Sequence, residues 1–225
     1  MSITEAMKAR HSVRQYKNQP IGAEMISALQ VEIDACNQES GLHIQLVTNE
    51  PKAFDGFMAH YGKFSGVTNY IAMIGKKESE LDEKCGYFGE RLVLKAQELG
   101  LNTCWVAMTY SKIKTAFRVG QGEKLCVVIA IGYGETQGVP HKSKAISEVA
   151  KAEGAMPDWF KSGMDAALLA PTAMNQQKFM FTLDGSKVSV KTGMGFYTKL
   201  DLGIVKYHFE IGAGKKLFYK EYTGL

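Results

Sequence analysis

The chain has 225 residues, of which 45% are hydrophobic and 22% charged, and its formal net charge is +4. These values are typical of a globular protein, and a chain of this length can bury one core or two small ones. The charge is too small, and the Lys and Arg residues too dispersed, to indicate a nucleic-acid-binding protein. A small anionic ligand fits this charge balance equally well.

The sequence predicts neither export nor a membrane span. Its first residues lack a basic stretch followed by an apolar one, and no apolar run approaches the roughly 18 residues that suggest a membrane helix. The four cysteines, Cys36, Cys85, Cys104 and Cys126, are widely spaced, which favours free thiols over disulfides or a zinc site. We therefore expect a cytoplasmic protein with no metal site, no nucleic-acid partner and no membrane partner.

Hydrophobic spacing predicts the elements of the first 131 residues. In chain order we expect a helix over 3–9, a helix over 21–37, a strand over 42–47, a helix or irregular excursion over 51–66, a strand over 70–74, a helix over 86–99, a helix cap and buried strand over 99–105, a short helix over 109–117, and a strand over 125–131. Tyr87 and Glu90 lie one turn apart among charged residues, so we expect them on the surface of their helix.

The remaining residues continue the mixture of helices and strands. We expect a loop and a polar helix within 132–154, a helix over 157–169, strands over 178–183 and 187–192 joined by the turn Asp184-Gly185, and a helix over 202–213. Helices and strands are not segregated, so the pattern leaves both the α/β and the α+β class open. Residues 25–47 and 160–182 share a helix–turn–strand order, and 89–100 and 203–214 are expected to be helices of equal length that are bounded by glycines. This suggests a pseudo-repeat, although such units are common.

Two segments could bind an anion. Arg10, Ser12 and Arg14 alternate, so in an extended chain their side chains point to one face. Guanidinium groups offer planar sets of donors that match phosphate oxygens. Lys142 and Lys144 alternate in the same way and could complete such a site. For each segment the alternative is a solvated basic loop.

Two further segments could contact a nucleotide or a heterocycle. The glycines of 132–138 have the spacing GxGxxxG and precede Val139-Pro140, so they do not fit a dinucleotide-binding fingerprint. The amides and the hydroxyl of 170–177 could bind the edge of a planar heterocycle, or could only bond their own turn. No catalytic triad or carboxylate pair is visible, and the lone histidines His11 and His208 are expected to be structural.

Together, the segments 10–14, 98–105, 142–144 and 170–177 resemble the motifs of the FMN-dependent nitroreductase family, and segments 86–90 and 201–210 resemble its branch of fused, two-half chains. The resemblance implies an α+β fold with a central, mostly antiparallel sheet flanked by helices. It further implies an intramolecular pseudo-dimer, with a first half over 1–151 and a shorter second half over 152–225 that completes the flavin site. Such a chain could be active as a monomer.

The resemblance also implies roles for individual residues. Arg10, Ser12 and Arg14, with the backbone of His11, would hold the FMN phosphate, ribityl chain and ring edge, and Lys142 and Lys144 would be a second phosphate contact. The flavin would lie on Trp105, Val106, Ala107 and Met108. The family's Pro-Ser turn corresponds to Pro171, Thr172, Ala173, Asn175 and Gln177. The chain departs from the family at Thr172, where Ser is common, and at Lys144, where Arg is common.

The activity that the resemblance implies is an FMN-dependent oxidation of NAD(P)H with reduction of a small acceptor, of nitroaromatic or quinone type, by a ping-pong mechanism. Because flavin carries the redox chemistry, no catalytic side chain is required of the protein. Two alternatives stay open: a non-catalytic FMN-binding or storage protein, and a flavin-fragmenting or dehalogenating relative on the same fold.

Overall fold

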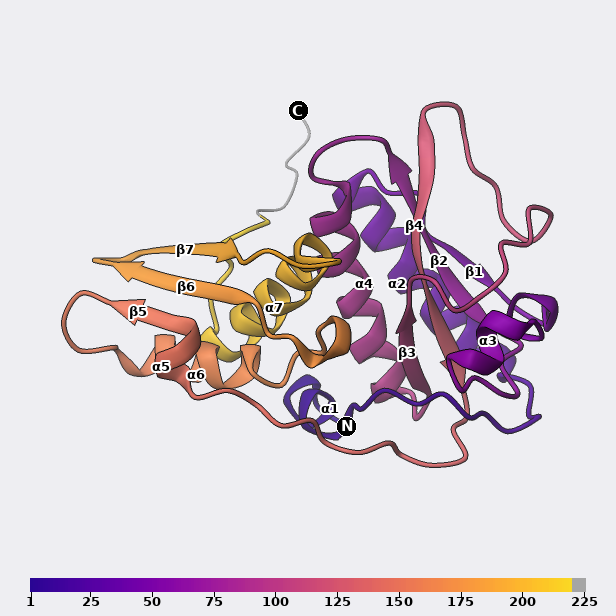
Figure 1. Cartoon of the computed structure of the whole chain (residues 1–225), viewed down its shortest axis with the longest axis horizontal. Coiled ribbons are helices and arrows are strands. Elements are labelled where there is room, and N and C mark those ends of the chain that lie inside the picture. The colour runs from indigo at the N-terminus through magenta and orange to yellow at the C-terminus, as the bar shows by residue number, and fades with distance from the viewer. Residues whose placement is uncertain (220–225) are drawn as a thin grey trace. The chain divides into compact units, whose positions relative to one another are not determined.

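The structure, a computed structural model, describes residues 1–219 (Figure 1). In chain order its elements are α1 (Ile3–Ala9), α2 (Ala23–Ser40), β1 (Gln45–Val47), η1 (Lys52–Phe54), α3 (Phe57–Tyr61), β2 (Tyr70–Lys76), α4 (Leu81–Glu98), β3 (Asn102–Val106), β4 (Glu123–Gly132), α5 (Ile146–Val149), β5 (Ala150–Ala152), α6 (Asp158–Ala167), η2 (Ala173–Asn175), β6 (Phe179–Asp184), β7 (Lys187–Thr192) and α7 (Thr198–Ala213). The chain forms two compact units. Unit 1 contains Met1–Leu81 and Leu92–Pro140, and unit 2 contains Asp82–Arg91 and the described residues from His141 onward.

Unit 1 is built on a four-stranded antiparallel sheet in the order β1-β2-β4-β3. The continuous apolar sequence of β2 and of the second half of β4 is explained by their burial, since Ile71 and its partner Ile129 are both fully enclosed. β3 pairs with β4 alone among the named strands, so its other edge is open to further backbone contacts. One such contact positions the candidate site.

The predicted short helix over 109–117 is wrong. Tyr110 is buried and its ring stacks on Phe54 with the centroids 6.2 Å apart, while the Ser111 N–H donates to the Ala53 carbonyl at 2.7 Å. Farther along, Phe117 packs against the same apolar cluster. These contacts draw side chains toward the core from an irregular backbone, so tertiary packing overrides the helical spacing of the sequence.

Unit 2 combines a small sheet with two packed helices. β6 lies between β5, which runs parallel to it, and β7, which is antiparallel and joined to it by the predicted turn after Asp184. Phe181 of β6 stacks on Phe209 of α7 with the ring centroids 4.6 Å apart. The predicted helix over 157–169 and the predicted pair of strands are confirmed as α6, β6 and β7.

Glycines bring the first part of α4 against α7. A Cβ on Gly86 would lie 2.0 Å from the Leu200 carbonyl oxygen, and a Cβ on Gly203 would lie 2.0 Å from the Glu83 carbonyl oxygen. Neither glycine ends its helix: α4 begins at Leu81 and α7 at Thr198, earlier than predicted. The prediction that Gly203 bounds a helix is therefore wrong, because this glycine serves a close crossing inside α7.

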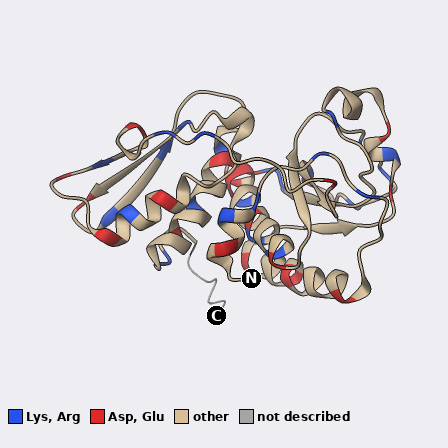
Figure 2. Cartoon of the chain, turned by 90° about the horizontal axis from the view of Figure 1, so that it is seen from below, with Lys and Arg blue, Asp and Glu red and all other residues tan. Residues whose placement is uncertain are grey.

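The predicted α+β class with mostly antiparallel pairing is confirmed: among the named strands of the described chain, only β5 and β6 pair in parallel. The strands form two sheets, of four and three strands, whereas the resemblance implied one central sheet. Figure 2 shows Lys and Arg interspersed with Asp and Glu on the elements of both units. Within residues 1–219, no helix combines the length and apolarity needed to cross a membrane. The division into halves at 151/152 and the pseudo-repeat stay predictions.

Candidate functional site

The segment that follows α1 is held extended along the open edge of β3. A capping box between Ser2 and Glu5 starts α1, and the helix ends at Arg10, whose backbone is extended with φ −70° and ψ 120°. Ser12 then forms a parallel bridge with Thr103, and the Val13 N–H donates to the Thr103 carbonyl at 3.0 Å. The chain is therefore extended here, which is the condition for the side chains of Arg10, Ser12 and Arg14 to point to one face.

Three of the predicted site residues lie on the extended segment that pairs with β3 at Thr103, next to the buried Cys104. Burial raises the pKa of Cys104, while Arg14, a hydrogen bond with Ser12, and Arg10 each act to lower it. Ser12 bridges Thr103, the residue before Cys104 on β3, and the charges of Arg10 and Arg14 act on the Cys104 thiol. Ser12 and Arg14 are exposed, whereas Arg10 is buried. The exposed hydroxyl and guanidinium donors fit an anionic group such as a phosphate.

The glycine-rich segment after β4 packs on this extended segment. Gly138 has φ +73°, and a Cβ there would lie 2.7 Å from the His11 Cβ. A Cβ on Gly134 would lie 2.8 Å from the Val13 side chain. No helix follows in the described chain until Ile146, so the segment lacks the strand-to-helix turn of a dinucleotide fingerprint. Gly134 and Gly138 are explained by close packing against residues 11–13, and a Cβ on Gly132 would lie 3.1 Å from the Tyr16 ring.

The predicted flavin-facing residues lie at the end of β3 and just beyond it. Trp105 is half-buried and pairs with Ile129, and Val106 is buried beside Val128 of β4. Two residues outside the strand follow, of which Ala107 is half-buried and Met108 is 67% exposed. The half-buried His11 lies in the same unit, next to Ser12.

In unit 2, the predicted lysine segment is bonded to the predicted Pro-Ser turn. Asn175 and Gln177 both donate from their amide nitrogens to the Lys142 carbonyl at 2.9 Å. The Lys144 N–H donates to the Gln177 Oε1 at 2.9 Å, and the Lys144 ammonium donates to the Gln177 carbonyl at 3.0 Å. The Thr172 hydroxyl accepts from the Gln177 N–H at 3.1 Å. These bonds agree with the alternative interpretation of the segment, in which its amides and hydroxyl only bond their own turn and its neighbours. A role of this turn in flavin binding stays a prediction.

The four predicted phosphate-binding cations are divided between the units. Arg10 and Arg14 belong to unit 1, while Lys142 and Lys144 belong to unit 2 with the turn Pro171–Gln177. Their action on a single phosphate stays a prediction. What the structure brings together is Arg10, Ser12 and Arg14 in one group and the lysines with the turn in another.

The sequence interpretation predicted no link between the turn and Asp201, and it gave Asp201 no role of its own. Asp201 accepts from the Ala173 N–H at 2.9 Å and from the Gln176 Nε2 at 2.7 Å, and Gln176 also donates to the Phe196 carbonyl at 2.8 Å. Burial raises the pKa of Asp201 to about 6, against the opposing influence of the bonds from Ala173 and Gln176. The available signal was a lone carboxylate between Leu200 and the apolar residues that follow it.

The prediction that Tyr87 and Glu90 lie on a helix surface is wrong. Tyr87 is 1% exposed and its hydroxyl donates to Glu210, while Glu90 is fully buried and 2.8 Å from the Nε2 of His208. His208 is also fully buried and its two ring nitrogens lie beside Ala166 and Glu90, which agrees with the structural role expected for it. Partners from α7, far along the chain, explain how these polar side chains can be enclosed.

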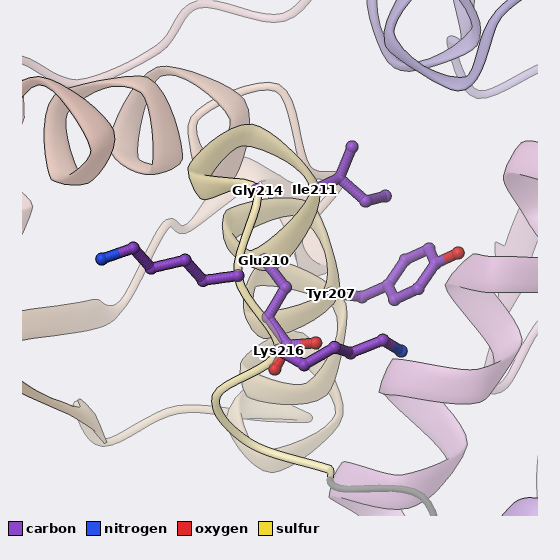
Figure 3. Close-up of a pocket in the computed structure, with 6 residues that line it drawn as sticks. Tyr207, Glu210, Ile211, Gly214 and Lys216 are labelled. Carbon is purple, nitrogen blue, oxygen red and sulfur yellow. The ribbon is translucent and has the colours of Figure 1, made fainter.

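Two cavities are lined by none of the residues predicted for the flavin site. One, of about 270 Å³, is formed at the end of α7, where Tyr207, Glu210 and Ile211 project from the helix and Lys216 from the segment after it (Figure 3). The other, of about 400 Å³, is in unit 1 and is lined by Lys112, Lys114, Phe117, Val119 and Leu125. Among residues 1–219, no group of three or more His, Cys, Asp or Glu side chains could hold a metal ion.

Comparison with solved structures shows the fold. A structure from Thermotoga maritima, described as a "putative nitroreductase", is 20% identical with a TM-score of 0.68, and the match covers 99% of this chain and 90% of that one. A "putative nitroreductase in complex with FMN" from Desulfovibrio desulfuricans is 14% identical with a TM-score of 0.50, covering 66% and 94%. A Parabacteroides distasonis structure, described as a "putative NADH dehydrogenase/NAD(P)H nitroreductase", is 20% identical with a TM-score of 0.50, covering 65% and 95%.

The comparison with curated proteins gave no match. The comparison with protein families gave a match to residues 2–213, nearly the whole chain, for the family described as "Putative TM nitroreductase". This extent agrees with the resemblance carried by the motifs around Arg10, Trp105 and Pro171 and with the fold of the Thermotoga maritima structure. The chain therefore belongs to this nitroreductase family.

Proposed function

We propose that this protein is an FMN-dependent oxidoreductase that takes a hydride from NAD(P)H and reduces a small acceptor, of nitroaromatic or quinone type. The observation that carries the proposal is the extended segment of Arg10, Ser12 and Arg14 held at Thr103 on the edge of β3, in a chain that belongs to a nitroreductase family. The FMN complex of one structural relative and the NAD(P)H named for another support the choice of cofactor and reductant.

The proposed roles follow from the chemistry of the side chains. When bound, FMN supplies the redox chemistry, so the protein needs to place it and to tune the charge around it. Ser12 and Arg14 present exposed donors for the phosphate, and the Lys142 and Lys144 side chains add positive charge. Trp105 to Met108 would support the ring, and the turn Pro171–Gln177 would contact its edge.

A reduction experiment tests this function against a storage role. We expect the purified protein to carry a yellow chromophore that bleaches within seconds when NADH or NADPH is added under nitrogen, and regains its colour when menadione follows. A chromophore that stays yellow with both nucleotides would instead indicate FMN binding without oxidoreductase activity. Fragmentation of the flavin, or release of halide when a halogenated phenol replaces menadione, would indicate one of the relatives with other chemistry.

Removing the exposed guanidinium of Arg14 should weaken FMN retention by about ten- to a hundredfold, because a charge-assisted hydrogen bond to phosphate is lost. Fluorescence titration of the FMN-free protein measures the Kd of Arg14→Ala directly. Arg118→Ala is the matched control, since Arg118 is an exposed arginine of the same unit outside the predicted site. Equal Kd values for the two variants would remove Arg14 from the site.

The proposed mechanism predicts ping-pong kinetics, because one exposed ring face would serve the reductant and the acceptor in turn. Initial rates measured against both substrates should give parallel double-reciprocal lines. Intersecting lines, together with inhibition patterns of a ternary complex, would show that both substrates bind at once and would overturn this part of the proposal.

The pseudo-dimer also belongs to the proposal. We expect one FMN per chain and an active monomer, in the cytoplasm, with a small molecule as substrate. Flavin titration combined with size-exclusion chromatography at low protein concentration measures both quantities. Two FMN per chain, or loss of FMN when the protein dissociates to monomers, would contradict the pseudo-dimer.

A further inference from the structure

Asp201 joins α7 to the turn that we propose as a flavin contact. Its Oδ1 accepts from the Ala173 N–H at 2.9 Å and its Oδ2 accepts from the Gln176 amide at 2.7 Å, so each carboxylate oxygen holds one donor of the turn. Asp201 is only 5% exposed. A carboxylate is rarely buried unless its oxygens are hydrogen-bonded, and here both bonds go to residues of one turn.

The turn has a backbone that requires such support. Met174, Asn175 and Gln177 have φ values of 50°, 52° and 45°, in the left-handed region that residues other than glycine rarely adopt. Each such residue costs conformational energy unless the surroundings determine its conformation. Asp201 bonds on either side of Met174, at Ala173 and at Gln176.

The orientation of the Gln176 side chain is fixed by the same group. Its Nε2 donates both to the Asp201 Oδ2 and to the Phe196 carbonyl, at 2.7 and 2.8 Å. Turning the amide by half a rotation would bring its oxygen against two acceptors, so only one orientation satisfies both partners. A carboxylate at Asp201 therefore fixes the orientation of the Gln176 amide. That amide in turn links the turn to Phe196, in the loop before α7.

We propose that Asp201 is a positioning residue, which holds the turn Pro171–Gln177 in the conformation that binds FMN. The proposal rests on the proposed function, because it concerns the same cofactor. Asp201 would act through Ala173 and Gln176, and need not touch the cofactor itself. Nothing in the resemblance or the comparisons assigns this residue a role.

The variant Asp201→Asn tests the proposal because it keeps the size of the side chain and removes one acceptor. Its oxygen can still accept from Ala173, but its NH₂ group faces the Gln176 amide, which also donates. We expect the Kd for FMN to rise about tenfold at about pH 8. Asp184→Asn is the matched control: Asp184 is an exposed aspartate of the same unit, at the end of β6.

The pH profile separates positioning from a general structural role. The pKa of Asp201 is raised to about 6, by burial, against the bonds from Ala173 and Gln176, and no charged side chain of the described residues is among the causes. Below that pH the wild-type side chain is protonated and offers fewer acceptors, as asparagine does. The ratio of the Kd of Asp201→Asn to the wild-type Kd should therefore fall toward 1 as the pH drops from about 8 to about 5.

Unfolding cannot produce this convergence. Because the folded pKa of Asp201 lies above its ordinary value of 3.8, the folded state binds the proton more strongly than the unfolded state. The contribution of this group to stability therefore grows as the pH falls through 6 toward 3.8, while FMN binding weakens. The titration of the FMN phosphate itself cancels in the ratio, since both proteins bind the same ligand.

Three outcomes would decide the question. A ratio of 1 at pH 8, equal to that of Asp184→Asn, or a raised ratio that does not change with pH, would overturn the role of Asp201. A wild-type chain that binds no FMN at any pH would overturn the proposed function instead.

If Asp201→Asn does not fold, the variant Gln176→Ala replaces it. This variant keeps the carboxylate and removes the linking amide, so it should also raise the Kd for FMN about tenfold.

Discussion

Replacing Gly203 by alanine should lower the free energy of unfolding by about 3 kcal/mol, and the melting temperature by about 6–12 °C. The added Cβ would lie 2.0 Å from the Glu83 carbonyl oxygen and 2.5 Å from the Tyr87 backbone nitrogen. Both neighbours are backbone atoms of α4, so no side chain can rotate away, and the two helices would have to separate. Separation would disturb the packed contacts between α4 and α7.

Thermal unfolding of Gly203→Ala, followed by circular dichroism, measures the effect. Gly193→Ala is the matched control in the same unit, because a Cβ at Gly193 would meet the Lys178 side chain at an ordinary distance of 3.5 Å. We expect that control to unfold within about 2 °C of the wild type. Equal melting temperatures for the two variants would show that α4 and α7 tolerate a side chain at the crossing.

Local sequence patterns predicted the parts of this fold that depend on near neighbours. The apolar runs of β2 and β4, the hairpin after Asp184 and the alternation of Arg10, Ser12 and Arg14 all correspond to features of the structure. A continuous apolar run, an alternation with a period of two and a short turn are all local patterns, which a single sequence displays directly. The family resemblance added the α+β class, which the spacing alone had left open.

What the sequence could not provide was the pairing of residues distant along the chain. Tyr87 and Glu90 have the spacing of an exposed helical stripe, and only Glu210 and His208, more than a hundred residues later, make their burial acceptable. The role of Asp201 was not predicted for the same reason, because its partners lie in a turn preceding it by 25 or more residues. The burial of a polar side chain can be predicted only when its hydrogen-bond partners are known. The spacing of residues along a helix gives no information about such partners.

The glycines show the same limit in another form. A glycine near the edge of a helical pattern favours a helix end, which is how Gly203 was interpreted. In the structure Gly203 lies inside α7, while Gly214 does end that helix, with φ +61°. The two glycines differ in what a Cβ would meet. At Gly203 it would meet a carbonyl of α4, whereas at Gly214 it would meet open space. That difference exists only once the helices have packed.

The largest effect that we expect is for Glu90→Ala, which should lower the free energy of unfolding by about 3–5 kcal/mol. Glu90 and His208 are both fully buried, with the Glu90 Oε1 2.8 Å from the His208 Nε2. The other ring nitrogen, Nδ1, lies 3.1 Å from the Ala166 carbonyl. A carbonyl can only accept, so Nδ1 carries a proton, and one further proton lies between Nε2 and the carboxyl group. Removing the carboxyl group leaves Nε2 buried without that partner.

Glu90→Gln is the matched variant, and it should cost only about 1 kcal/mol, because the glutamine NH₂ group can donate to the unprotonated Nε2 of a neutral His208 and fills almost the same volume. Urea unfolding of both variants at neutral pH measures the difference. A cost for Glu90→Gln as large as for Glu90→Ala would mean that charge on the carboxylate is what unit 2 requires. Wild-type stability in Glu90→Ala would mean that the hydrogen bond to His208 contributes nothing to the packing of α4 on α7.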